Sequence, residues 1–145
     1  MKKVLKLKDI VKLRSGMVVS KTANNDEKLL TEAFVRMIGT SDFDENDCLI
    51  GNIEPNVFYK SAIEKNYLQF GEILFNSKGR RFFAYLFTNE YENIIASASF
   101  IVLTLKNNVV VPDFLVWFLN HPETLKFFDS KKSTQVMPSI SKQEL

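Results

Sequence analysis

Apolar residues along most of the chain form short runs between polar turns, which is the pattern of strands. The clearest predicted strands are Phe34–Ile38, which ends at Gly39, and Ile94–Leu105, which is the longest β-prone stretch. Shorter strands are predicted at Val57–Ile63, Ile73–Phe75, Arg81–Phe87 and Val109–Val111, with a turn at Asn107-Asn108. The middle of the chain is therefore expected to form a hairpin or a meander.

Two segments of the first half have a less regular pattern. Val4–Leu13 suits a strand and a short helix equally well, and Arg14-Ser15-Gly16 is a turn signal. Asp42–Asn52 is expected to be an acidic loop.

The apolar period becomes helical after residue 111. Pro112 near the first helical position and Asp113 in the first turn predict a helix start, and Pro122 with Glu123 predicts a second one. An apolar stripe along these helices is predicted to pack in the core, and its members are Phe114, Trp117, Phe118, Leu125 and Phe128. Beyond it, the sequence predicts a polar loop at Ser130–Ser139 and a capping box at Ser141–Glu144.

These elements predict a single α+β domain over residues 1–145, with a twisted, mostly antiparallel sheet or partial barrel and C-terminal helices. The length of 145 residues fits one core, and thirteen phenylalanines supply much of its apolar area. Hydrophobic residues make up 46% of the chain and charged residues 25%, as in globular proteins.

Composition also bears on the compartment. No apolar run is long enough for a transmembrane helix, and lysines interrupt the N-terminal residues where a secretory signal would be apolar. A single cysteine, Cys48, excludes an internal disulfide and fits a reducing compartment. We therefore expect a cytoplasmic protein without a membrane partner.

Charge is divided unevenly along the chain, although the net charge is only +2. The stretch from Asn24 to Glu54 holds eight acidic and two basic residues, a charge of −6, so the remainder carries +8. The basic part has the charge to meet phosphates. The alternative is that both parts are solvated faces of an ordinary domain.

The sequence offers no set of catalytic residues, and we expect no enzyme, no metal and no cofactor. One histidine and one cysteine are too few for a zinc site: His121 has a helix-boundary position that suits capping or the surface, and Cys48 suits a small buried apolar residue. Glycine-rich phosphate loops are missing. A metal-dependent nuclease is disfavoured because only Asp9 precedes the acid-x-Lys triplet Asp26-Glu27-Lys28.

The most distinctive segment is a polar turn that follows the predicted strand Ile73–Phe75. It gathers an amide, a hydroxyl, a glycine and three cations: Asn76, Ser77, Gly79, Lys78, Arg80 and Arg81. Such a turn can offer hydrogen-bond donors and positive charge to an anionic partner.

Four segments, in order, resemble the target-recognition domain of a type I restriction–modification specificity subunit. Residues 7–16 read LKDIVKLRSG, similar to the family's L-x-D-I/V-x-x-x-x-S-G, and residues 68–79 read LQFGEILFNSKG, similar to L-x-x-G-D-I-L-x-x-x-R-G. Residues 96–103, ASASFIVL, with 111–115, VPDFL, resemble a strand and the helix start hydrophobic-P-x-Y/F-L. Residues 133–145 resemble the closing G-S/T … I-S-x-x-x-L, while Glu72 and Lys78 replace the family's usual Asp and Arg.

The resemblance implies a non-catalytic domain that binds one half of a split DNA target. Its partners would be double-stranded DNA, the methyltransferase subunit and the restriction subunit. Because the chain ends where the family continues into a spacer helix and a second recognition domain, we expect a fragment, a half subunit that could form a homodimer, or a stand-alone relative.

Three loops are the expected DNA contacts. The first choice is the turn with Asn76, Ser77, Lys78, Gly79, Arg80 and Arg81, since arginine reads guanine bidentately or holds a phosphate. The second holds Arg14, Ser15 and Lys21, and the third Lys131, Lys132, Ser133, Thr134 and Gln135.

Structural roles compete with these contacts. Asn76, Ser77 and Gly79 suit turn formation, Arg14-Ser15-Gly16 suits a strand exit, and Lys131-Lys132 suits a helix C-terminus. We expect Glu72 to be a structural acid near the turn. The double substitution Arg80→Ala plus Arg81→Ala is expected to weaken DNA binding.

Two other functions remain open. The chain could be a protein-docking domain of the same fold that has lost DNA binding, or the recognition domain of a single-chain restriction enzyme.

Overall fold

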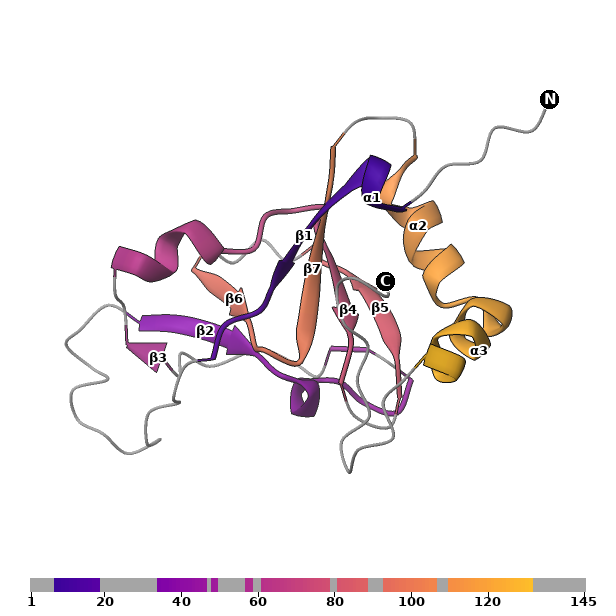
Figure 1. Cartoon of the computed structure of the whole chain (residues 1–145). Helices are drawn as coiled ribbons and strands as arrows, with labels where there is room; N and C mark the ends of the chain where they lie inside the picture. Colours follow the sequence, from indigo (N-terminus) through magenta and orange to yellow (C-terminus); the bar gives the residue numbers. More distant parts are fainter. Residues whose placement is uncertain are drawn as a thin grey trace.

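The structure is a computed structural model that describes residues 7–18, 34–46, 48–49, 57–58, 61–78, 81–88, 93–106 and 110–131. Within these residues a four-stranded sheet lies between two C-terminal helices on one side and a smaller group of strands on the other (Figure 1). The predicted mixed α+β fold with a mostly antiparallel sheet and C-terminal helices is confirmed. The sheet does not close into a barrel.

The larger sheet is antiparallel throughout and has the strand order β1-β7-β4-β5. Its strands are β1 (Val11–Ser15), β4 (Ile73–Asn76), β5 (Phe83–Leu86) and β7 (Phe100–Leu105). The short helix α1 (Leu7–Ile10) leads directly into β1, so the ambiguous N-terminal segment contains both a helix and a strand.

The smaller group has the strand order β3-β2-β6, in which β2 runs parallel to β6 and antiparallel to β3. Its elements are β2 (Phe34–Ile38), the 3-10 turn η2 (Thr40–Asp42), β3 (Val57–Phe58), the 3-10 helix η3 (Ser61–Asn66) and β6 (Ile94–Ala96). The chain after β1 crosses to this group, because the N–H of Gly16 donates to Phe100 and that of Met17 donates to Ala96.

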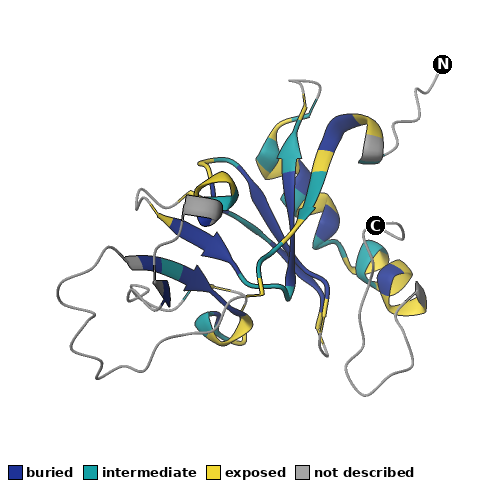
Figure 2. Ribbon diagram, turned by 60° about the vertical axis from the view of Figure 1, so that its left-hand side comes forward, coloured by how far each residue is buried: buried dark blue, intermediate teal, exposed yellow. Residues whose placement is uncertain are grey.

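The middle of the sheet is buried on both faces, and β4 is buried at every position (Figure 2), whereas the edge strand β1 has exposed positions. Ile73 and Phe75 pack toward the helices with Leu103, while Leu74 packs on the opposite face with Phe100. Alternation along β4 and β7 therefore divides the core into two apolar layers. The phenylalanines fill both layers, as Phe75 does with Phe128 and Phe43 with Phe83.

Several predicted strands need correction. Ile94–Leu105 is two strands, because Ser97 to Ser99 form a turn that carries the chain from the smaller group to the larger sheet. Val57–Ile63 begins as the two-residue β3, but residues from Ser61 onward form η3. Arg14 and Ser15 end β1, so the predicted turn there is a strand exit at Gly16.

Both predicted helices are confirmed as α2 (Pro112–Leu119) and α3 (Pro122–Lys131). The predicted core stripe is wrong for three of its aromatic residues, since Phe114, Trp117 and Phe118 are exposed. Leu115 and Leu119 face the sheet instead. Both sides of α2 are apolar, so the period alone did not decide which side would be buried. Phe128 is buried as predicted.

Two single-residue expectations have opposite outcomes. Cys48 is exposed rather than buried, since it lies in the loop that Asp44 organises by accepting hydrogen bonds from the N–H groups of Asn46 and Cys48. His121 has the predicted capping position, because its Nδ1 accepts a hydrogen bond of 3.3 Å from the N–H of Glu123 at the start of α3. Three predictions lie outside the described residues. They are the Asn107-Asn108 turn, the part of the C-terminal loop after Lys131 and the capping box at Ser141–Glu144.

Candidate nucleic-acid interface

A partly buried ion pair joins the first two family-like segments. Arg14 on β1 donates from Nη1 and Nη2 to the two carboxylate oxygens of Glu72, at 2.6 and 3.0 Å. The Thr104 hydroxyl on β7 and the N–H of Gln69 also donate to this carboxylate. The Glu72 side chain is 5% exposed and that of Arg14 is 30% exposed. Glu72 is thus the structural acid that the sequence led us to expect.

The ionisation of Glu72 follows from these contacts. Burial by itself raises the pKa of the carboxyl group, but hydrogen bonds from Arg14, Thr104 and Gln69, with the charge of Arg14, outweigh it. The pKa of Glu72 therefore lies below its ordinary value, and the carboxylate stays charged beside Arg14.

Backbone geometry explains why Glu72 reaches this position. Gly71 has φ of +91°, a conformation that side chains disfavour, and it turns the chain just before β4. The N–H of Gly71 donates to the carbonyl of Phe87, and the N–H of Phe87 donates to the carbonyl of Glu72. These two bonds fix Glu72 at the end of the β4–β5 ladder.

Gly16 is required for a different reason. A Cβ atom at this position would overlap the carbonyl oxygen of Ser97, because the two backbones cross there. The Ser-Gly pair ends the first family-like segment. It therefore lets the chain after β1 change its pairing partner from β7 to β6.

The turn after β4 begins with two buried polar residues. Asn76 is 5% exposed and donates from Nδ2 to the carbonyl of Arg81 at 2.7 Å, and Ser77 is 2% exposed and donates to the carbonyl of Ser99. Both side chains thus stabilise the start of the turn, where it leaves β4. The Oδ1 atom of Asn76 is buried and has no hydrogen-bond partner among the described residues.

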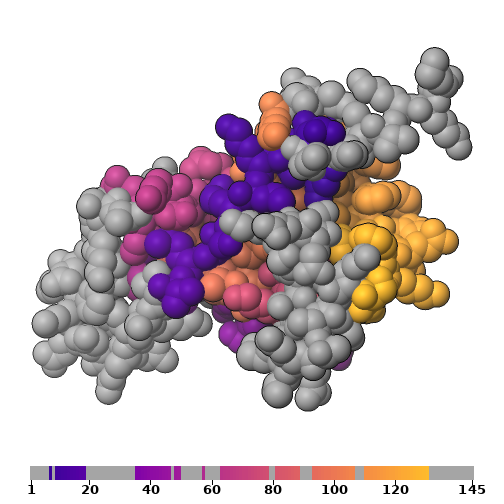
Figure 3. Space-filling model, viewed as in Figure 1, coloured from indigo at the N-terminus to yellow at the C-terminus, as the bar shows by residue number. Residues whose placement is uncertain are grey.

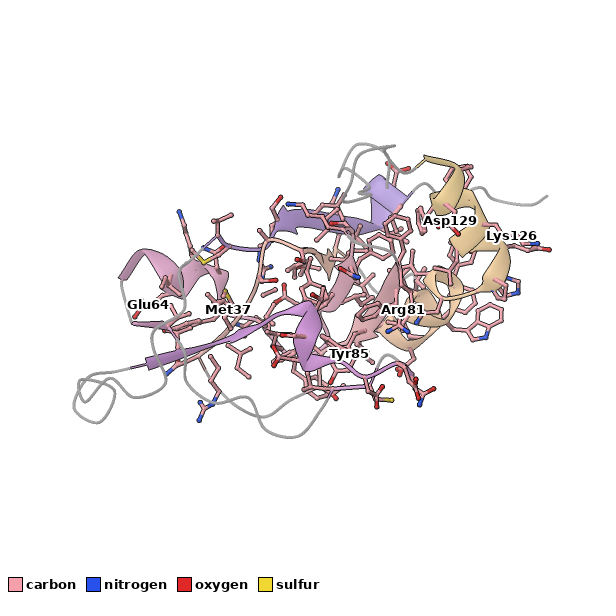
Figure 4. All side chains as sticks on the ribbon, turned by 90° about the horizontal axis from the view of Figure 1, so that it is seen from below. Met37, Glu64, Arg81, Tyr85, Lys126 and Asp129 are labelled. Atoms are coloured by element: carbon pink, nitrogen blue, oxygen red, sulfur yellow. The ribbon has the colours of Figure 1, made fainter. Side chains whose placement is uncertain are left out.

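The two described cations of this turn differ in their surroundings. Lys78 is exposed. Arg81 donates to the carbonyls of Glu45 and Asp44 at 2.6 and 3.0 Å, and its guanidinium lies 5.7 Å from the centre of the Phe83 ring. Figure 4 labels Arg81 and Tyr85 in the same part of the structure, and the Phe83 ring that Arg81 contacts belongs to the apolar layer opposite the helices. Arg81 therefore ties the acidic loop to the base of the turn.

Strand pairing brings two of the three predicted contact loops to one end of the sheet. Ser15 at the end of β1 pairs with Ile101, and Asn76 at the end of β4 pairs with Phe100, on either side of β7. The exits of β1 and β4 are therefore neighbours across a single strand. We call this end of the sheet, with Ser15, Asn76, Ser77, Lys78 and Arg81, the turn edge.

The remaining predicted contacts are not placed by the structure. Lys131 ends α3 in the backbone. Its side chain lies outside the described residues, as do Lys21, Gly79, Arg80, Lys132, Ser133, Thr134 and Gln135.

Sequence reasoning missed the partners of Glu72. Thr104 is the one polar side chain in the apolar run of β7, which is a signal that it serves a polar neighbour. A cavity of about 460 Å³ lies beside this network, and its lining includes Phe70, Glu72, Thr104, Lys106 and Val111.

No group of three metal-ligating side chains occurs among the described residues. Within the same residues, every helix is too short or too polar to cross a bilayer. Neither a scan of protein-family models nor a search of curated proteins finds a match to this chain.

Proposed function

We propose that this chain recognises a specific duplex DNA sequence as the specificity subunit, or half subunit, of a type I restriction–modification complex. It would do no chemistry itself and would act in the cytoplasm with a methyltransferase subunit and a restriction subunit. The proposal rests on the resemblance of four sequence segments to the recognition domain of that family.

The packing of these segments supports the proposal. Arg14 of the first segment binds Glu72 of the second, and both contact Thr104, directly after the third. The first two segments therefore pack against each other through Arg14 and Glu72, next to the strand of the third segment.

The structural observation that best supports the proposal is the turn edge. Antiparallel pairing on both sides of β7 sets the exits of β1 and β4 side by side, so that a groove of DNA could meet both at once. Lys78 is exposed there, and Arg80 follows it in the sequence.

We assign different tasks to the residues of this edge. Lys78, which is exposed, and Arg80 would contact phosphates or base edges. Asn76 and Ser77 would stabilise the start of the turn, and Arg81 would bind the end of the turn to the acidic loop. Arg14 would act through Glu72 by keeping the β4 exit in position.

One alternative has a specific observation in its favour. Arg14 and Arg81, two of the predicted DNA-binding cations, already bind protein groups. A domain that keeps this fold but docks a methyltransferase subunit without binding DNA would be consistent with that use.

The direct test of the turn edge is the double variant Lys78→Ala plus Arg80→Ala. It leaves Arg81, and hence the anchored loop, intact. The matched control is Lys65→Ala plus Lys126→Ala, which removes two exposed lysines from η3 and α3. Binding to labelled duplex would be followed by fluorescence anisotropy between low and moderate salt, with the methyltransferase subunit present.

We expect the first pair to weaken binding and to reduce the slope of log affinity against log salt by about two, because each phosphate contact contributes about 0.9. The control pair should leave both unchanged. Equal losses in the two double variants would mean that only net charge matters and would remove the turn edge from the footprint.

A further inference from the structure

The strand at one edge of the larger sheet has a strongly apolar sequence. In the described part of the chain, β5 is the last strand in the order β1-β7-β4-β5, and it lies within residues 82–87, which read FFAYLF. An apolar, aromatic-rich run without a charge or a proline is typical of segments that pair with copies of themselves. The opposite edge strand differs, because β1 carries Lys12 and Arg14. The outward side of β5, which we call the β5 edge, has no such charge of its own.

Strand pairing shows which backbone groups of β5 face outward. The N–H of Phe87 donates to the carbonyl of Glu72 at 2.8 Å, and the ladder continues toward β4 at every second residue of β5. Because the direction of the backbone groups alternates along a strand, the N–H and C=O groups of Ala84 and Leu86 point away from β4. These are the groups with which a further strand would pair.

One side chain occupies both outward groups of Ala84. Asn120 accepts a hydrogen bond at Oδ1 from the Ala84 N–H, at 2.8 Å, and donates from Nδ2 to the Ala84 carbonyl, at 2.9 Å. A residue of a neighbouring antiparallel strand would make the same pair of bonds. A strand of a second molecule would therefore have to displace this amide before it could pair along β5.

The helices hold Asn120 at this position. Asn120 is the C-terminal cap of α2, and its own N–H donates to the carbonyl of Val116 at 3.0 Å. The preceding residue, Leu119, is buried in the same apolar cluster as Ala84. α2 contacts β5, and in Figure 3 the orange and yellow atoms of α2 and α3 form one side of the molecule. Packing of α2 on the sheet thus keeps the amide next to Ala84.

We propose that Asn120 protects the β5 edge, because its amide takes the hydrogen bonds that would otherwise allow a second copy of this chain to add its own β5 to the sheet. The excluded partner is a second copy, since identical apolar strands pair edge to edge and antiparallel pairing of β5 with itself is symmetric. The inference rests on backbone hydrogen bonds and holds whether or not the turn edge binds DNA.

Asn120→Ala removes both bonds and leaves the outward groups of Ala84 open. We expect the folded variant to shift from the mass of the wild type to that of a dimer or a larger species as the protein concentration rises. Sedimentation velocity of the full chain would measure the shift, and circular dichroism would show that the fold is retained. Asn120→Ser should behave in the same way, since a hydroxyl is too short to bind both groups, and it provides the test if the alanine variant does not fold.

Two further variants separate edge pairing from a loss of stability. Ile95→Ala truncates a buried side chain in an apolar cluster that contains no residue of β5, and it should unfold more easily without a change in mass. The double variant Asn120→Ala plus Leu86→Lys places a charge on the open edge at a partly buried position and should return to the mass of the wild type.

Three results would overturn the inference. An unchanged mass in the folded Asn120 variants would mean that the amide does not protect the edge. Equal association of Ile95→Ala would assign the effect to core residues exposed by a loss of stability. Association that persists in the double variant with Leu86→Lys would place the contact outside β5.

Discussion

Glu72 is a buried polar residue that contacts three separate parts of the fold. Its carboxylate accepts hydrogen bonds from β1, from β7 and from the turn before β4, so that one residue joins three segments far apart in the sequence. A buried carboxylate costs free energy unless donors compensate for the lost water. Arg14 and Thr104 provide that compensation, and the family-like Gly-Glu pair is therefore a structural feature.

Removing this charge should destabilise the protein. Glu72→Gln keeps the shape of the side chain but leaves Arg14 without its counter-ion, so we expect the free energy of unfolding to fall by about 1–3 kcal/mol at neutral pH. Urea denaturation of the wild type and the variant would measure the difference.

The pH dependence of this stability difference shows whether it comes from the charge of Glu72. The pKa of Glu72 is lower in the folded state than in the unfolded state, so its contribution is complete above the unfolded pKa and is lost as the pH falls through the folded pKa. The stability gap between wild type and Glu72→Gln should therefore shrink in acid. A gap that stays constant down to acidic pH would contradict the ion pair.

Gly16 permits the closest backbone crossing near this site. Gly16→Ala should lower the free energy of unfolding by more than about 2 kcal/mol, because its Cβ would overlap a backbone carbonyl that cannot move aside. Gly39→Ala is the matched control. A Cβ there would have its nearest neighbour, Asp42 Oδ2, at 3.8 Å, and the φ of Gly39 is an ordinary −118°.

Thermal denaturation followed by circular dichroism would compare these two glycine variants. Gly39→Ala should be close to neutral. Similar losses of stability in both variants would mean that loss of glycine flexibility, rather than the crossing at Ser97, determines the effect.

Elements with clear local signals were predictable from the sequence. Pro112 and Pro122 each begin a helix, Phe34–Ile38 is a strand, and the apolar stretch of β7 is a strand. The turn at Ser97–Ser99 was not, because its small residues also suit a strand, and only the crossing with Gly16 requires the chain to turn there.

The side of α2 that would be buried was also not predictable. Phenylalanine and tryptophan outweigh leucine in any apolar pattern, yet the sheet accepts Leu115 and Leu119 and leaves the larger rings outside. Alternation in β4 and β5 presents Phe75 and Ala84 to the helix layer, and that layer has room for leucine next to Phe128.

This arrangement can be tested with two substitutions on the same helix. Leu119→Ala should lower the free energy of unfolding by about 2–5 kcal/mol, because it leaves a cavity in the core. Trp117→Ala should change it by only about 0.5 kcal/mol, since the ring is largely in solvent. Chemical denaturation would give both values, and a larger effect at Trp117 would mean that the opposite side of α2 is buried.

At the scale of the molecule, two layers of strands and one layer of helices pack against one another. The loops therefore meet at the ends of the strands. The sequence indicated the contact loops separately, but it could not indicate that β7 brings the exits of β1 and β4 together, since this depends on strand order. It also did not indicate that Arg81 binds the acidic loop, because its partners are the backbone carbonyls of Asp44 and Glu45.

The acidic and basic parts of the chain are separate in the sequence but meet in the folded structure. The acidic stretch is not remote from the basic turn, since Arg81 holds its backbone next to the turn edge. Only Lys78 and Arg80 are then assigned to the partner, and the negative charges of Asp44 and Glu45 nearby would weaken binding to the phosphate backbone of any duplex. Under the proposed function, the turn edge would therefore have a weak non-specific affinity for DNA.

The most direct test of the proposed function is a selection from a random duplex library with the full chain and the methyltransferase subunit. The proposal predicts enrichment of one short sequence, which is lost in Lys78→Ala plus Arg80→Ala and kept in Lys65→Ala plus Lys126→Ala. Recovery of duplexes without sequence preference, or no recovery at low salt from a folded complex, would contradict sequence-specific recognition by this chain.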